Sequence, residues 1–471
     1  MKKRFKKGMR VLSLGIAVLL MVGMLSGCGG KDETKDENGR TIVSVGSWPG
    51  KEGPSLDAMN ARKERYEAEN TDAVIEPDLW AFDLKTFYAK AAGGQLPTVF
   101  PSHFTEIAQI IDAEYSADIT EVLEKRGYEG KFNEQILDLV SKDGKVYAFP
   151  TGAYVLGLAY NTDMFEKAGL MQEDGTPIQP KNWEEVAEFA VKIKEATGKP
   201  GFVFPTADNS GGWIFTSLAW SCGVDFMEQD KDGNWKATFN TPEAVEALQY
   251  IKDLKWKYDV LPANNLINDG EYYKTFGVEN AAMMITAGDY PGKVIKYGMT
   301  PDKIGMMAMP AGPKRHVTLM GGLLYCINAN STDEQIDAAI RWLETEANFN
   351  ATEDFKQTKR DKIKQTIENN GHIGIKSLSV WSTDAEGLAF EHQLIEENAN
   401  ANPNHIKLYN EFVANCPAEI QPEEPVCAQE LYGILDRCIQ EVLTNKDADC
   451  AQLIEKASVD FQANYLDNLT Y

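Results

Sequence analysis

Aromatic side chains are plentiful in this sequence, with nine tryptophans and eighteen tyrosines among 471 residues. Four of them lie at predicted strand ends, in glycine-rich loops or at a helix start, where a ligand can reach them: Trp48, Trp213, Tyr290 and Tyr432. Three other tryptophans lie at or within predicted helices and are expected to be structural: Trp183, Trp256 and Trp342. An aromatic face packs against the C–H face of a sugar ring, while carboxylates and amides bind the sugar hydroxyls. The accessible rings therefore favour carbohydrate binding, although each single ring fits a protein core equally well.

Catalysis is the other chemistry to consider, and acidic pairs are its obvious candidates in a chain with 71 Asp and Glu residues. Adjacent residues on a helix do not face each other, so these pairs are expected to be solvated faces and not glycosidase acid–base pairs: Glu184-Glu185, Glu396-Glu397 and Glu423-Glu424. The sequence contains no G-x-S-x-G, Walker A, G-x-G-x-x-G or H-E-x-x-H motif. We therefore expect a binding protein that is not an enzyme and has no cofactor.

Metal sites are not expected either. The segment DKDGNW, Asp230 to Trp235, resembles a calcium loop but lacks the third ligand spacing and the closing Glu, so we expect a hairpin turn there. Cys222 and Cys326 lie in apolar surroundings. Four more cysteines near the C-terminus are not close to any of the five histidines, which argues against zinc: Cys416, Cys427, Cys438 and Cys450. One disulfide stays open as an alternative to core packing, with Cys416–Cys427 the easiest loop to close.

The elements that would position these side chains alternate between strand and helix. Apolar runs at 41–48, 73–80 and 97–100 predict strands, and the periodicity of 84–94 predicts a helix that ends at a Gly-Gly pair. Further along, Asn182 with Glu185 begins a helix that ends at Gly198, and Thr241-Pro242 begins another. This alternation predicts an α/β protein whose sheet is largely parallel with helices on both faces.

The N-terminal segment is typical of a secretory signal. A cationic head is followed by a short apolar stretch from Val11 to Leu25, too short for a comfortable membrane span. Leu25 to Cys28 resembles the bacterial lipoprotein box, which implies removal of residues 1–27 and lipidation of Cys28, palmitate among the acyl groups. The protein would then be anchored to the cell membrane on its extracellular face, with residues 28–40 as a flexible tether. An ordinary signal peptide or a signal anchor is the alternative.

Charge narrows the set of partners. Residues 1–27 contain six Lys and Arg and no Asp or Glu, so the mature chain has 41 basic and 71 acidic residues, a net charge of −30. Such an acidic surface argues against binding to nucleic acid or to anionic lipid. It also argues against a strongly anionic ligand, unless a local basic pocket exists.

Seven motifs follow one another in a familiar order. The segments KAAGGQLPTVF, VYAFPTGAYVLGLAYNTDMFEKAGL and PKNWEEVAEFAVKI are followed by PEAVEALQYIKDL, AAMMITAGDY, IGMMAMPAGP and GGLLYCINANS. Together they resemble the type 1 extracellular solute-binding proteins, the maltose-binding class of ABC importers, over nearly the whole mature chain. The chain departs from the family pattern at Thr98, where Asp is usual, which affects a local cap and not the fold.

The resemblance implies a two-lobe, periplasmic-binding-protein-like (type II) fold with a ligand cleft between the lobes. The first lobe would take residues 41–150 and 291–330, and the second lobe residues 151–290 and 331–471.

By position, the ligand-contacting places of the family fall on nine residues: Trp48, Ser102, Thr105, Glu106, Tyr154, Trp213, Asp289, Tyr290 and Tyr432. The resemblance implies that Glu106 and Asp289 accept hydrogen bonds from hydroxyl groups. It implies stacking on the sugar by Trp213, Tyr290 and Tyr432. Some relatives carry an acidic residue at the place of Tyr154, which implies a different sugar register here. Trp381 lies in a segment without an aligned motif and is a secondary candidate.

The implied function is capture of a carbohydrate, in particular an oligosaccharide, and its delivery to the permease subunits of an ABC transporter by a monomeric protein. Closure of the two lobes on the ligand would be the signal to the permease. Three alternatives stay open at this point. The ligand could be a polyamine or a peptide, the protein could be a sensor or adhesin that does not take part in transport, or it could be a surface glycoside hydrolase.

Overall fold

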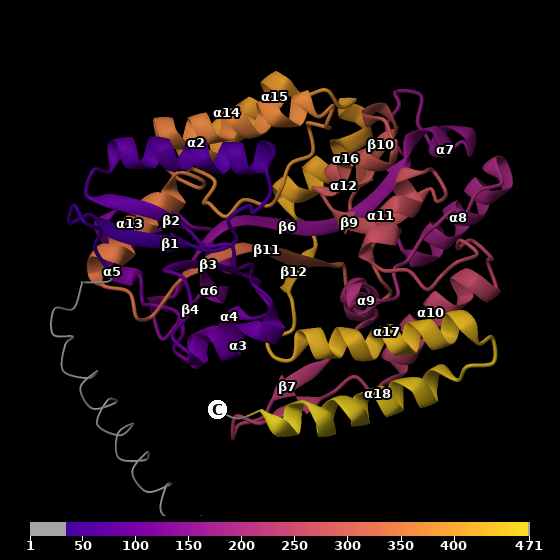
Figure 1. Ribbon diagram of the computed structural model, residues 1–471. Coiled ribbons are helices and arrows are strands. Elements are labelled where there is room, and N and C mark those ends of the chain that lie inside the picture. Colours follow the sequence, from indigo (N-terminus) through magenta and orange to yellow (C-terminus); the bar gives the residue numbers. More distant parts are fainter. Residues whose placement is uncertain (1–33, 470–471) are drawn as a thin grey trace, which may run out of the picture.

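The computed structural model describes residues 34–469 (Figure 1). The predicted signal peptide, the lipidation site Cys28 and the first part of the predicted tether lie outside these residues. None of the described helices is both long and apolar enough to cross a membrane. The fold is α/β, with a bent sheet whose two ends belong to two different lobes (Figure 1).

The first lobe is built on three strands near the N-terminus. They are β1 (Thr41–Val45), β2 (Ala73–Pro77) and β3 (Val99–Ser102). Strand β1 pairs in parallel with both β2 and β3, as the strand–helix alternation predicts. The connecting helices are α2 (Pro54–Glu69), α3 (Leu84–Ala92), α4 (Ile107–Asp112), α5 (Thr120–Lys125) and α6 (Glu134–Leu139), and β4 (Ser141–Lys142) and β5 (Lys145–Val146) form a small hairpin.

Three strands meet where the two lobes join, and they are here called the crossing strands: β6 (Ala148–Asn161), β11 (Val317–Ile327) and β12 (Glu419–Pro422). Strands β6 and β11 run from one lobe into the other, and the short strand β12 pairs with β11 at the crossing. The first half of β6 pairs with β11, and its second half pairs with β9 (Met283–Ala287) and β10 (Ile304–Met307). These pairings are antiparallel, as is that of β11 with β3, so the prediction of a largely parallel sheet is wrong outside β1–β3 and the parallel pair of β11 with β12. The physical reason is that β11 returns from the second lobe in the direction opposite to β6.

The second lobe surrounds the far half of β6 with helices. Helix α8 (Trp183–Thr197) begins with the predicted cap, in which Asn182 accepts a hydrogen bond from the backbone of Glu185, and ends at Gly198 with φ 69°. Thr241 likewise caps α10 (Pro242–Trp256). The other elements of this part of the chain are α7 (Thr162–Lys167), α9 (Ser210–Cys222), α11 (Asp269–Gly277), α12 (Tyr290–Val294), η1 (Ile295–Tyr297) and η2 (Pro301–Lys303).

The C-terminal third of the chain is mostly helical and contributes to both lobes. Its helices are α13 (Asp333–Glu344), α14 (Glu353–Glu368), α15 (Glu386–Asn398), α16 (Pro403–Asn415), α17 (Ala428–Thr444), α18 (Cys450–Asn464) and η3 (Leu466–Asn468). Helix α13 packs on β1, and α14 packs beside α2 (Figure 1). Helix α16 packs on β10, whereas α17 and α18 pack on α10.

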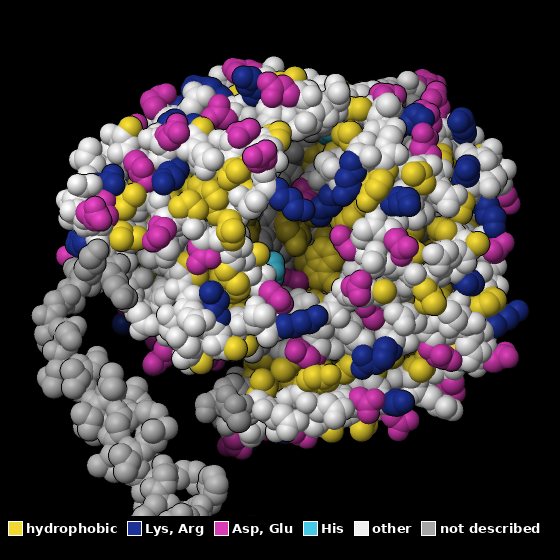
Figure 2. All heavy atoms as spheres, in the orientation of Figure 1, with side chains coloured by type: hydrophobic (Ala, Val, Ile, Leu, Met, Phe, Trp, Pro, Cys, Tyr) yellow, Lys and Arg dark blue, Asp and Glu magenta, His cyan; other side chains and the backbone are white. Residues whose placement is uncertain are grey.

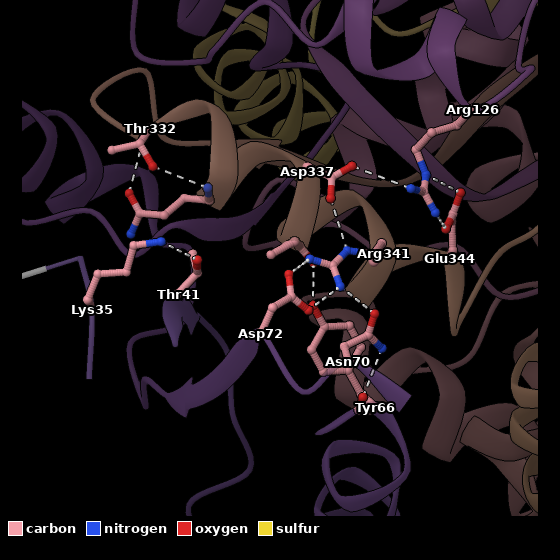
Figure 3. Close-up of polar contacts among 12 residues, drawn as sticks. Lys35, Thr41, Tyr66, Asn70, Asp72, Arg126, Thr332, Asp337, Arg341 and Glu344 are labelled. Atoms are coloured by element: carbon pink, nitrogen blue, oxygen red, sulfur yellow. Dashed lines mark hydrogen bonds and ion pairs between the residues drawn. The ribbon is translucent and has the colours of Figure 1, made fainter. Parts of the chain in front are cut away.

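Ion pairs on α13 show how firmly this helix belongs to the first lobe. Arg341 of α13 pairs with Asp72 at 2.8 Å and donates a hydrogen bond to Asn70, both in the turn before β2 (Figure 3). Arg126, which follows α5, pairs with Glu344 at the other end of α13 (Figure 3).

These contacts differ from the lobe boundaries expected from the sequence. The expectation placed residues 291–330 in the first lobe, yet β10 pairs with the second-lobe half of β6. It placed residues from 331 onward in the second lobe, yet α13 and α14 pack on β1 and α2. We therefore propose that the first lobe comprises about 41–150 and 324–398. The second lobe would then comprise about 156–316, 403–415 and 428–469.

Two smaller expectations concern turns and cysteines. The segment around Asp230 is the predicted hairpin turn, between β7 (Met227–Gln229) and β8 (Trp235–Ala237). The carboxylate of Asp230 accepts hydrogen bonds from the backbone of Asp232 and Asn234 and needs no cation to order the turn. The six cysteines that the structure describes are all free thiols, Cys416 and Cys427 among them.

Candidate ligand-binding cleft

A hollow opens between the two lobes beside the crossing strands (Figure 2). Apolar side chains line its inner walls, and both acidic and basic side chains lie around its rim (Figure 2). Its inner part, here called the aromatic pocket, has a volume of about 270 Å³ and includes Tyr154, Trp213 and Tyr432. A second pocket of about 970 Å³ lies between α3 and α17, and His103, Asn209 and Gln429 line both. The two pockets therefore form one extended cleft.

The crossing strands make the floor of the aromatic pocket. Tyr154 lies on β6 and Gly322 on β11, and the two strands are paired there. A Cβ atom on Gly321 would lie 2.4 Å from the hydroxyl of Tyr154, and one on Gly322 would lie 2.3 Å from the carbonyl oxygen of Gly152. Real side chains do not approach so closely, so these two glycines let Tyr154 lie flat against β11.

Trp213 forms one wall of the aromatic pocket from the first turn of α9. Its ring meets that of Tyr154 edge to face, with centroids 6.5 Å apart and an interplanar angle of 82°. The start of α9 is held by Asp436 of α17, whose carboxylate accepts hydrogen bonds from the backbone N–H groups of Asn209 and Gly212, each at 2.7 Å. A buried carboxylate at a helix N-terminus satisfies donors that have no partner inside the helix. Asp436 therefore anchors the first turn of α9, which carries Trp213 at the wall of the pocket.

Tyr432 and Glu423 complete the second-lobe side of the pocket. Tyr432 is buried in the first turns of α17, and its hydroxyl donates to Oε1 of Glu423 at 3.3 Å. Glu423 directly follows the crossing strand β12. Burial raises the pKa of Glu423 to about 7, although hydrogen bonds from Trp213 and Tyr432 oppose this rise. The carboxyl of Glu423 can therefore accept or donate a hydrogen bond near neutral pH.

The first lobe contributes the segment after β3. Thr105 lines the aromatic pocket and Glu106 lines the second pocket. Burial raises the pKa of Glu106 to about 7, and the negative charge of Glu430 adds to this rise. The hydroxyls of Ser102 and Thr105 are buried and have no hydrogen-bond partner among residues 34–469. Buried polar groups normally have one, so Thr105 is a ready donor or acceptor for a ligand in the pocket.

Three of the residues expected to contact the ligand do not line the cleft. Trp48 is 4% exposed and stacks on Trp342, with ring centroids 6.0 Å apart, in the core of the first lobe. Tyr290 is fully buried, and its hydroxyl donates to the carbonyl oxygen of Gly305, so the ring is a core residue of the second lobe. Asp289 lies at the surface and pairs with Lys293 at 3.2 Å. The secondary candidate Trp381 is also a core residue, stacked on Phe132.

The structure brings six of the nine expected residues to the cleft or directly beneath it: Ser102, Thr105, Glu106, Tyr154, Trp213 and Tyr432. It adds residues that the sequence reasoning missed: His103, Asp208, Asp269, Glu423, Gln429 and Glu430. Their common signal is a polar residue just after a strand, just before a helix or in the first turn of a helix.

The pair Glu423-Glu424 corrects the expectation of a solvated helical face. It lies in a loop between β12 and α17, where neighbouring residues point to different environments. Glu423 faces the cleft, and Glu424 is buried and accepts a hydrogen bond from Trp220 Nε1 at 3.0 Å. Pro422 and Pro425 flank the pair and were the sequence signal against a helix.

Metal chemistry finds no support in the part of the chain that the structure describes. Residues 34–469 contain no group of three or more His, Cys, Asp and Glu side chains placed to hold a metal ion.

Two lobes joined by crossing strands, with a cleft at the crossing, define a two-lobe protein of the periplasmic-binding-protein type. The crystal structure of the cyclic α-maltosyl-1,6-maltose binding protein from Arthrobacter globiformis has this fold, with a TM-score of 0.65 and 23% identity over 92% of this chain and 100% of that one. The family model named Bacterial extracellular solute-binding protein matches residues 50–348. The chain belongs to that family, as its motif order predicts.

Relatives of known sequence agree with this assignment. The Arabinooligosaccharide-binding protein of Bacillus subtilis (strain 168) is 31% identical over 199 residues, 41% of this chain and 42% of that protein. A putative binding protein of Brucella abortus (strain 2308) is 26% identical over 281 residues, 58% of this chain. The matched region spans 64% of the length of the Brucella protein. The family and the structural neighbours are binding proteins, not enzymes.

Proposed function

We propose that this protein captures a carbohydrate, and in particular an oligosaccharide, in the interlobe cleft and delivers it to the permease subunits of an ABC transporter. The single observation that carries the proposal is the aromatic pocket, where Trp213, Tyr154 and Tyr432 surround a space edged by carboxyl groups. Rings take the C–H faces of a sugar and carboxyl groups take its hydroxyls. Relatives named for binding cyclic α-maltosyl-1,6-maltose and arabino-oligosaccharides support the same ligand class.

The two halves of the cleft come from the two lobes, which supports closure as the mechanism. Thr105 and Glu106 belong to the first lobe, whereas Trp213 and Tyr432 belong to the second. A ligand that contacts both sets binds the closed form more tightly than the open form, and so shifts the population toward closure. The crossing strands β6, β11 and β12 would act as the hinge. The closed protein is the form that the permease would bind.

The extended length of the cleft favours an oligosaccharide over a single sugar. A monosaccharide would fill the aromatic pocket alone, whereas the second pocket offers space for further units beside Glu106 and Gln429. Stacking and several charge-assisted hydrogen bonds are compatible with micromolar or tighter binding, on the order of −8 kcal/mol.

The test is a thermal-shift screen of the mature protein against neutral mono- and oligosaccharides, since a ligand that binds the folded state raises the melting temperature. Trp213→Ala should weaken binding by about 30-fold, as expected for a central aromatic anchor. Trp235→Ala, in the hairpin of β7 and β8, is the matched control and should bind normally, because Trp235 lines neither pocket of the cleft. Equal affinity in Trp213→Ala would contradict the assignment of the site. A sugar recovered in hydrolysed form would instead indicate a glycoside hydrolase.

We also propose that Cys28 is lipidated and holds the protein at the outer face of the cell membrane. The support is the Leu25 to Cys28 sequence after a basic and apolar leader. Two or three acyl chains bind a bilayer stably without a membrane-spanning helix. Cys28→Ser should release the protein from the membrane fraction into the medium. Continued membrane association of that variant would contradict the proposal.

A further inference from the structure

The cleft is strongly acidic where its ligand would lie. Asp208, Asp269 and Glu423 line the aromatic pocket, and the described lining of that pocket includes no Lys or Arg. Glu106 and Glu430 line the second pocket. Lys85 and Arg437 lie at the second pocket, and Arg437 donates a hydrogen bond to the carbonyl oxygen of Gly433. Within residues 34–469, neither Glu106 nor Glu423 has a Lys or Arg partner.

Two of these carboxyl groups lie in the two adjoining pockets of the cleft, Glu106 in the second pocket and Glu423 in the aromatic pocket. Glu106 follows β3 in the first lobe, and Glu423 follows β12 at the entrance to the second. After burial itself, the negative charge of Glu106 contributes to the raised pKa of Glu423, and that of Glu430 contributes to the raised pKa of Glu106. Charged carboxylates that are buried together repel and lose hydration. Closure of the cleft therefore has an electrostatic cost that a neutral ligand does not remove.

The hydroxyl of Thr105 supports a ligand at this place. Thr105 is 2% exposed and lines the aromatic pocket, and its hydroxyl makes no hydrogen bond of ordinary geometry among the described residues. Its closeness to the Glu106 carboxyl only partly offsets the rise in the pKa of that group. A buried hydroxyl without a well-aligned partner is unfavourable, and a bound ligand would supply that partner. Because Thr105 is the immediate neighbour of Glu106, such a ligand would also lie next to the Glu106 carboxyl.

We propose that the carbohydrate bound in this cleft carries an ammonium group, as an unacetylated amino sugar does, and that this group lies between Glu106 of the first lobe and Glu423 of the second. The inference rests on the proposed function and narrows its ligand class. Two carboxylates bind an ammonium by charge-assisted hydrogen bonds. The ring faces of Trp213 and Tyr154 add a cation–π contribution.

This placement couples ligand charge to lobe closure. In the open form the two carboxyl groups are hydrated separately. In the closed form they face one another, and the ammonium replaces both the lost water and the missing basic side chain. An aminated ligand is therefore favoured in the closed state, whereas a neutral sugar of the same shape leaves the repulsion in place.

The experiment is isothermal titration of the mature protein at pH 7 with ligands matched in linkage. Glucosamine and its β-1,4-linked di- and trisaccharides carry the ammonium, the N-acetylated forms lack its charge, and glucose, cellobiose and cellotriose lack the nitrogen. We expect the best aminated ligand to bind at least 10-fold more tightly than both of its neutral counterparts. Equal or tighter binding of the neutral sugars would overturn this inference and leave the proposed function standing. Binding of spermidine with no binding of any sugar in the set would overturn the proposed function itself.

Two variants assign the preference to the two carboxyl groups. Glu106→Gln and Glu423→Gln should each reduce the preference for the aminated ligand at least 10-fold, measured in each variant as the ratio of its affinity to that of the matched neutral sugar. Glu411→Gln, an exposed carboxylate on α16, is the control and should keep the preference. A preference that survives in both cleft variants would overturn the placement. The comparison of ligands on the unmodified protein needs no variant and stands even if one of them fails to fold.

Discussion

The hydroxyl of Tyr432 donates a hydrogen bond to Oε1 of Glu423 at 3.3 Å, and the contact joins the start of α17 to the end of the crossing strand β12. One wall of the aromatic pocket is thereby tied to the proposed hinge. Tyr432→Phe removes this donor and keeps the ring. We expect a further rise in the pKa of Glu423 above about 7 and a roughly 5-fold loss of ligand affinity, about 1 kcal/mol.

The measurement for Tyr432→Phe is a titration of ligand affinity against pH, with the unmodified protein as reference. The loss of affinity should be accompanied by a shift of the pH midpoint to higher values. An unchanged midpoint would show that the hydroxyl does not act on Glu423.

The close contact between α9 and α17 predicts that Gly212→Ala lowers both stability and ligand affinity. A Cβ atom on Gly212 would lie 2.2 Å from the carbonyl oxygen of Tyr432, so Gly212→Ala must push the two helices apart. Overpacking of this kind costs about 1–3 kcal/mol. Denaturant unfolding should show that loss, together with weaker ligand binding because Trp213 and Tyr432 move. Gly292→Ala, where the added methyl would have no described neighbour within 4 Å, is the control and should change stability by less than about 0.5 kcal/mol.

The raised pKa of Glu423 predicts a dependence of stability on pH. The folded protein keeps the proton up to about pH 7, whereas the unfolded chain releases it near the ordinary value of 4.5. The folded state therefore binds more protons between these values, and the free energy of unfolding falls as the pH rises, by up to about 1.4 kcal/mol per pH unit. Glu423→Gln should remove this contribution and become more stable than the unmodified protein near pH 8.

The control for the pH experiment is to measure, at each pH, the difference in free energy of unfolding between the unmodified protein and Glu423→Gln. Burial and the nearby His405 lower the pKa of His372 to about 4, so this histidine lowers stability as the pH falls below about 6.5. It acts in both proteins alike and cancels in the difference. Parallel stability curves for the two proteins from pH 5 to 8 would show that Glu423 ionises normally.

The contacts that Arg62 makes between α2 and α13 predict a large contribution of this residue to the free energy of unfolding. Its guanidinium is 6% exposed, pairs with Glu346 at 2.8 Å, donates to the carbonyl oxygen of Trp342 and lies over the Trp342 ring. Arg62→Ala should reduce the free energy of unfolding by about 3 kcal/mol, because Glu346 keeps only Lys362 as a partner. Lys63→Ala breaks an i,i+4 pair at the surface and should cost less than about 1 kcal/mol. Urea unfolding of both variants distinguishes them, and equal losses would contradict the account.

Local sequence signals predicted much of this fold because they act over short distances. The caps at Asn182 and Thr241 and the strands β1 to β3 follow from the side chains of a few neighbouring residues. The antiparallel pairing of β6 with β11 joins residues more than 150 positions apart, and no short-range pattern encodes its direction. The lobe boundaries were misplaced for the same reason, since α13 has the periodicity of a surface helix but gives no sign of which sheet it covers.

The candidate site was predictable to a similar degree. The resemblance to the family placed Thr105 and Glu106 among the ligand-contacting residues, and both line the cleft just after a strand, at the edge of the sheet where ligands bind. It does not tell which way an aromatic ring turns, so Trp48 and Tyr290 were included although both rings turn into the core. Glu423 was missed because an acidic pair suggests solvent, and its burial depends on Trp213 and Tyr432 arriving from distant helices.

The hydrogen bond from the backbone of Asn209 to Asp436 spans 227 positions of the chain. During synthesis on the ribosome, the backbone N–H groups at the start of α9 have no acceptor until α17, which carries Asp436, has been made. The second lobe therefore stays incomplete until α17 emerges, which would suit the secretion that the N-terminal segment predicts. Assembly of the sugar-facing wall would then follow emergence of the final helices, so that cargo is accepted after translocation and not before.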